Sequence, residues 1–88
     1  MANRKSGREE QSRVKWYFLS FRDPKKNRNL GCCNVGVEGG LMKALEKARE
    51  LKINPGGEVM ASRIGKSELE PDRLYSRKEM LNLGYEFY

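Results

Sequence analysis

The chain has 88 residues, which is the size of one compact domain and too short for two hydrophobic cores. Its 18 lysines and arginines exceed its 12 aspartates and glutamates, so it carries a formal charge of +6 and should favour anionic partners. The lack of histidine argues against histidine-based triads and zinc hydrolases, and without an apolar run of roughly 20 residues or a signal peptide we expect a cytoplasmic protein.

Residues 1–13 form a basic N-terminal arm with four cations and two acidic residues. Apart from the initiating methionine its only apolar residue is Ala2, so burial would not offset the entropy of ordering it. We therefore expect residues 1–13 to be disordered and residues 14–88 to form one α+β domain. The arm either keeps the chain soluble or neutralises phosphate groups.

Residues 14–21 predict the first strand, because they are mostly aromatic or aliphatic and contain neither glycine nor proline. Both faces of this strand are apolar, which is typical of a central strand covered on both sides. We expect Trp16 and Phe18 to face the core. Tyr17, on the other face, is then the better candidate for stacking on a base, with Trp16 as the second candidate.

A polar turn over residues 23–29 connects this strand to a second one over residues 30–37. The two strands predict a hairpin with a basic tip. Cations beside aromatic side chains hold nucleotides by pairing with phosphate while the rings stack on bases. The candidate phosphate-binding residues are Arg22, Lys25 and Arg28.

Cys32 and Cys33 lie in the second predicted strand, where neighbouring side chains point to opposite faces. They would not ligate one metal ion without distortion, and the sequence has no other cysteine or histidine to complete a site. We expect buried, reduced thiols, no metal and no cofactor.

Residues 41–51 predict an amphipathic helix, which is followed by a glycine turn over residues 53–59. The amides of Gly56, Gly57 and Glu58 would converge on an anion, with Asn54 beside it. The alternative is an ordinary turn at the end of a helix, because proline and glycine are the residues that such turns use.

Residues 58–64 predict a third strand, parallel to the second, since a crossover helix connects the two. The expected fold is α+β: a three-stranded mixed sheet, ββαβ in order 2-1-3, with one crossover helix and a short C-terminal helix. The C-terminal helix starts from a capping box at Ser76 and Glu79 and ends at Gly84. One crossover helix covers one face of the sheet, so the remaining aromatic surface predicts a homo-oligomer.

The aromatic opening over residues 16–21 and the Ile-Asn-Pro-Gly-Gly-Glu-Val motif over residues 53–59 also carry a resemblance. With these motifs the chain resembles a group of small proteins from bacteriophages and mobile elements, over roughly residues 16–64. The resemblance implies a phage setting, which would place the protein in the cytoplasm of the host cell. By analogy with small phage inhibitors, it suggests sequestration of a host nucleotide signal in counter-defence.

The leading hypothesis is thus a non-catalytic protein that binds a phosphate-bearing ligand such as a cyclic nucleotide or a dinucleotide. It is not expected to be an enzyme, because the carboxylates are scattered and none pairs with another in sequence. Two alternatives remain open: a nucleic-acid-binding protein that grips phosphates with its arm and hairpin tip, and an inhibitor that docks on an acidic host enzyme. No membrane partner is expected.

Overall fold

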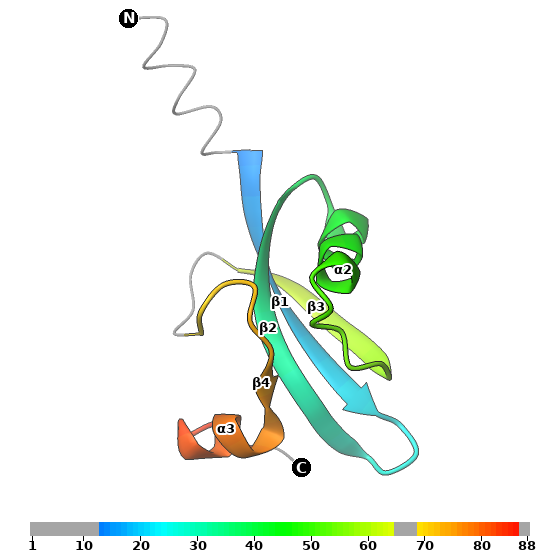
Figure 1. The fold of residues 1–88 in the computed structure, drawn as a ribbon, viewed down its shortest axis with the longest axis vertical. Helices are drawn as coiled ribbons and strands as arrows, with labels where there is room; N and C mark the ends of the chain where they lie inside the picture. Colours follow the sequence, from blue (N-terminus) through cyan, green and yellow to red (C-terminus); the bar gives the residue numbers. More distant parts are fainter. Residues whose placement is uncertain (1–12, 65–68, 87–88) are drawn as a thin grey trace, which may run out of the picture.

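The computed structural model describes residues 13–64 and 69–86. The predicted arm, except for Arg13, lies outside the described residues. The elements in chain order are β1 (Val14–Asp23), β2 (Arg28–Glu38), α2 (Leu41–Glu50), β3 (Glu58–Ile64), β4 (Tyr75–Ser76) and α3 (Arg77–Asn82) (Figure 1). Within these ranges no helix is long and apolar enough to cross a membrane.

The strands form one sheet in the order β3-β1-β2-β4. The α+β class and the central place of β1 between β2 and β3 are therefore confirmed. The predicted three-stranded mixed sheet is wrong in two respects: β4 adds to the free edge of β2, and every paired neighbour is antiparallel. β2 and β3 run in the same direction on either side of β1, as predicted.

The β1–β2 hairpin is longer than predicted and its turn is tighter. β2 begins at Arg28, so the turn contains only residues 24–27. The Asp23 carboxylate accepts hydrogen bonds from the backbone N–H groups of Lys25 (3.0 Å) and Lys26 (3.3 Å), which is the turn chemistry expected of aspartate. The tip is therefore a fixed turn that presents its lysine side chains to solvent.

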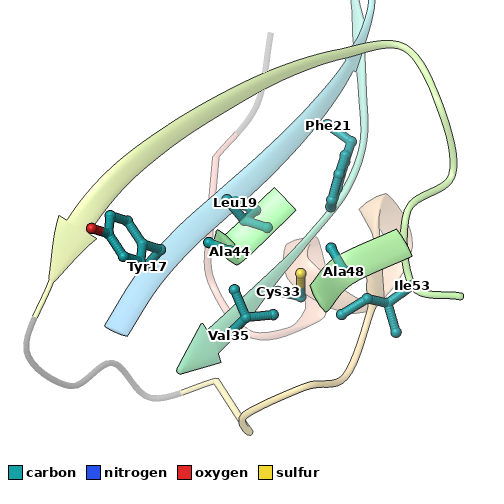
Figure 2. Packing of buried hydrophobic residues seen from close by; sticks show 8 residues of the cluster. All are labelled: Tyr17, Leu19, Phe21, Cys33, Val35, Ala44, Ala48 and Ile53. Carbon is teal, nitrogen blue, oxygen red and sulfur yellow. The ribbon is translucent and has the colours of Figure 1, made fainter. Parts of the chain in front are cut away.

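The main core lies between α2 and one face of the sheet (Figure 2). It contains eight buried residues: Tyr17, Leu19, Phe21, Cys33, Val35, Ala44, Ala48 and Ile53. A second cluster covers the opposite face and contains Cys32, Leu69, Tyr75 and Met80, with Phe18 and Tyr85 packed against it. Both apolar faces of β1 are therefore covered, one by α2 and the other by the C-terminal segment.

Tyr17 is buried, so the prediction that it is the better candidate for stacking on a base is wrong. Its side chain is 9% exposed and belongs to the main core, whereas Trp16 is half-buried on the opposite face and its ring lies over Gly36. The two faces of β1 are equally apolar, so alternation alone did not reveal which of them α2 would cover.

Cys32 and Cys33 lie in opposite clusters, as the alternation of a strand requires. Both are free and fully buried. Burial raises the pKa of Cys32 to about 11 and that of Cys33 to about 12, so both thiols are protonated near neutral pH. The prediction of buried thiols is confirmed.

The C-terminal segment is held to β2 by β4, which pairs with Gly31 and Cys32, and by a hydrogen bond that the Asn34 side chain donates to the Leu69 carbonyl (3.1 Å). Residues within the segment also hold one another. The capping box of α3 is confirmed: the Glu79 N–H donates to the Ser76 hydroxyl (3.1 Å), and the Ser76 N–H donates to the Glu79 carboxylate (3.2 Å). Arg73 pairs with Glu79 at 2.7 Å and lies 4.4 Å from the ring centre of Tyr75. In the part of the chain that is described, this segment covers the sheet face that had suggested a homo-oligomer.

Candidate anion-binding site

The hairpin tip and α3 lie at the same end of the molecule (Figure 1), and both carry cationic residues. No ion pair within the described ranges involves any of them, whereas Arg73 and Lys47 are paired with carboxylates. Unpaired cations keep their charge available to an anion. The set consists of Arg22, Lys25, Lys26, Arg28, Arg77 and Lys78.

A hollow of about 240 Å³ opens beside the hairpin, on the sheet face opposite α2. We call it the tip pocket; it is lined by Ser20, Arg22, Asn27, Arg28, Asn29, Met60 and Glu86. Two guanidinium groups, two amides and a hydroxyl surround it, together with one carboxylate and one apolar side chain. Guanidinium and amide groups are the donors that hold phosphate oxygens.

The positions of the polar side chains in the tip pocket follow from an irregularity in the hairpin. The register shifts between Phe21 and Arg22, so that Arg22 faces Asn29. The Asn29 side chain donates to the Ser20 hydroxyl (2.9 Å) and accepts from the Gly31 N–H (2.9 Å). The bond to Ser20 bridges the two strands at the irregularity, the bond from Gly31 lies within β2, and together they hold the Asn29 amide at the pocket wall.

Arg22 is held across the turn by a hydrogen bond from its guanidinium to the Asn27 side-chain oxygen. Asn27 has a φ of 51°, the left-handed conformation that asparagine tolerates better than most residues. One guanidinium group therefore joins the strand end to the turn. The other guanidinium, that of Arg28, follows at the start of β2.

The glycine turn lies against the end of β1, and its residues serve the fold. The Gly56 N–H donates to the Asn54 side-chain oxygen (2.8 Å), so this amide is already used within the turn. A side chain at Gly57 would collide with the backbone carbonyl of Arg22. Glu58 faces Arg22 in the β1–β3 register and is exposed. The contacts favour the helix-end turn over the anion loop.

The remaining candidate residues are not brought together. Trp16 lies six residues from Arg22 along β1, a separation of about 20 Å, and Tyr17 is buried. Lys25 is at the exposed tip and does not line the tip pocket. Arg22 and Arg28 both line the tip pocket, next to the end of β1 against which the glycine turn packs.

Sequence reasoning missed several residues of the site. Ser20 shares a strand face with Arg22, and this spacing was available as a signal. Glu86 and the α3 cations come to the hairpin only because the C-terminal segment folds back across the sheet, which no local pattern indicates. The missed residues are Ser20, Asn27, Asn29, Met60, Glu86, Arg77 and Lys78.

Among the described residues no group of three or more histidine, cysteine, aspartate or glutamate side chains is placed to hold a metal ion. Comparisons of the chain with protein-family models, with curated proteins and with solved structures found no match. The resemblance to phage-associated proteins therefore stays a prediction.

Proposed function

We propose that this protein is a non-catalytic binding protein for a phosphate-bearing small ligand, and that the tip pocket is where it binds. The observation that carries the proposal is that Arg22 and Arg28 both line one hollow and neither forms an ion pair with a described residue. Hydrogen bonds between a guanidinium and a phosphate are charge-assisted and often bidentate, so two such groups favour a phosphate over a neutral ligand.

The other lining residues favour a nucleotide over inorganic phosphate. Met60 is 65% exposed and offers an apolar surface to a base. The Glu86 carboxylate accepts hydrogen bonds but donates none, so it suits a ribose hydroxyl and opposes a second phosphate beside it. A ligand with a phosphate at one end and a nucleoside at the other would place the phosphate at the arginines and the nucleoside at Met60 and Glu86.

Binding without catalysis is supported by the lack of activated groups near the pocket. The chain has no histidine, and burial raises the pKa of both thiols to about 11 and 12. Glu86 is the one carboxylate in the described lining of the tip pocket, so that lining offers no acid–base pair of carboxylates. A role in sequestering a nucleotide signal follows from the phage resemblance and is part of the proposal.

A second candidate function is nucleic-acid binding, and the position of Lys25 and Lys26 favours it. Both are exposed at the hairpin tip, beyond the tip pocket, where they would reach further phosphates of a polymer. On this alternative, affinity for DNA or RNA falls steeply with salt. Salt-insensitive binding of a mononucleotide would favour the pocket instead.

Thermal denaturation of the full chain with AMP, ADP, cyclic AMP, cyclic di-AMP and a short DNA tests the proposal. A nucleotide at a hundredfold excess over its Kd adds about 2.7 kcal/mol of stability, which for a domain of this size raises Tm by on the order of 10 °C. Arg22→Gln and Arg28→Gln should each weaken binding by roughly tenfold or more. Arg49→Gln, an exposed site on α2, is the control and should bind as the wild type does.

The proposal fails if no nucleotide stabilises the wild-type protein. It also fails if both arginine variants bind as tightly as Arg49→Gln.

A further inference from the structure

A second hollow, of about 610 Å³, adjoins the tip pocket between the hairpin turn and α3. We call it the α3 pocket; it is lined by Asn27, Arg28, Arg77, Lys78 and Leu81. Asn27 and Arg28 line both hollows. Arg28 therefore lies where the two meet, and any ligand that it holds is within reach of both.

The α3 pocket brings two more cations to Arg28. Lys78 is exposed and Arg77 is half-buried, and no ion pair with a described residue neutralises either of them. The Arg77 Nε atom is buried and has no hydrogen-bond partner in the described protein. The Arg77 side chain as a whole is half-buried and lines the α3 pocket, so its charged guanidinium group is available to an anionic oxygen there.

The first turn of α3 holds these two cations at a fixed place. Ser76 and Glu79 close the capping box directly around them, and Met80 is fully buried against Cys32 of β2. The side chains therefore start from a backbone that is anchored to the sheet. Anchored donors lose less conformational entropy when they bind than donors on a free loop do.

We propose that the α3 pocket is a second phosphate subsite of the same binding site, so that the ligand carries two phosphate groups with Arg28 between them. The inference rests on the proposed function of the tip pocket and names its ligand class. One phosphate is held by Arg22 and Arg28, the other by Arg77 and Lys78. The Glu86 carboxylate lines only the tip pocket, so the α3 pocket has no described acidic group in its lining. A dinucleotide with a terminal phosphate carries the two phosphate groups that the two pockets require.

The dinucleotides pApA and ApA test the second subsite, because they share both nucleosides and differ by one phosphate. Calorimetry on the full chain should give tighter binding of pApA by roughly tenfold or more, the effect of one charge-assisted phosphate contact. Arg77→Gln and Lys78→Gln should each remove most of that preference and change ApA binding by less than about threefold. Arg49→Gln is the matched control and should keep the preference.

The outcomes separate the two proposals. If wild-type protein binds ApA and pApA equally, or if the α3 variants weaken both to the same extent, the second subsite is refuted and the tip pocket stands. If neither dinucleotide binds, and the nucleotide panel gives no stabilisation, the proposed function is refuted and the second subsite with it. Because Lys78 is exposed, Lys78→Gln should not destabilise the fold. It therefore tests the second subsite even if Arg77→Gln lowers Tm.

Discussion

Gly57 shows at the scale of one residue why the turn after α2 contains two glycines. Its φ is 79°, and a Cβ there would overlap the carbonyl of Arg22 and lie 3.2 Å from the Leu30 side chain. Gly56 has a similar φ of 95°, but a Cβ at that position would meet nothing within 4 Å. The two glycines thus share a backbone conformation, but only Gly57 lies against neighbouring atoms.

We expect Gly57→Ala to be clearly more destabilising than Gly56→Ala. Both variants lose about 1–2 kcal/mol because alanine disfavours the left-handed region, and only Gly57→Ala adds a clash with backbone. Urea unfolding of the two variants measures the difference. Equal losses would show that the glycine turn does not pack on β1 as described.

The two buried thiols predict a loss of stability at high pH. In the unfolded chain the thiols ionise near pH 9, whereas in the folded protein burial raises their pKa values to about 11 and 12. Above pH 9 the unfolded state therefore holds fewer protons than the folded state, and stability falls by up to about 1.4 kcal/mol per pH unit for each thiol. Urea unfolding between pH 8 and 10.5 should show a shallower fall for Cys33→Ala than for the wild type; equal slopes would contradict the burial of Cys33.

Single residues also show where sequence reasoning about the site reached its limit. The predicted hairpin indicated that Arg22 and Arg28 lie close together. The glycine turn, by contrast, left two interpretations open, an anion loop and a helix-end turn, because glycine and asparagine suit both. Only the contact of Gly57 with Arg22 and the bond from Gly56 to Asn54 distinguish the two.

Among the elements, the sequence predicted β3 and α2 nearly to the residue, and it predicted α3 and both strands of the hairpin, although each hairpin strand extends two residues further toward the turn than expected. Their signals are local: alternation, helical spacing and a capping box. β4 was missed because a strand of two residues has no alternation to recognise, and its pairing with β2 depends on the path of the C-terminal segment. The path of the C-terminal segment also determines which face of β1 it covers and which face is left to α2.

The capping box makes a prediction about α3 as an element. α3 has only six residues and depends on its cap and on Met80 for its position. We expect Ser76→Ala to lower the free energy of unfolding by about 1 kcal/mol. Ser62→Ala, an exposed serine on β3, is the control and should change stability little. A neutral Ser76→Ala would mean that the cap does not hold α3.

At the scale of the whole molecule, the homo-oligomer stays a prediction, but its basis changes. The aromatic face is covered by the chain itself, whereas β3 is an edge strand that pairs with β1 on one side only in the described structure. An open edge strand is the common route to pairing with a second copy. Self-association is therefore expected along β3.

Sedimentation velocity at tens of micromolar should show a dimer of the wild-type chain. A lysine on the outer edge opposes strand pairing, so Ser62→Lys should give a monomer. Met42→Lys, at an exposed site on α2, should leave the dimer intact. A wild-type monomer, or equal behaviour of the two lysine variants, would remove the prediction.

The proposed binding site depends on how the whole chain folds. It combines the end of β1, the start of β2, one residue of β3 and the C-terminal segment, which are far apart in sequence. Local patterns indicated the basic hairpin tip. They gave no sign of Arg77 and Lys78, because the approach of α3 to the hairpin is a result of tertiary packing.

Mapping a ligand onto the structure by NMR tests the proposed binding site most directly. Uniformly ¹⁵N-labelled full-length protein is titrated with pApA, and backbone and arginine Nε–H shifts are followed. We expect saturable shifts at Ser20, at residues 27–29, and at the Nε–H groups of Arg22, Arg28 and Arg77, with the Trp16 indole and α2 unchanged. Shifts centred on residues 54–58 or on Trp16, or no saturable shift at all, would contradict the proposed site.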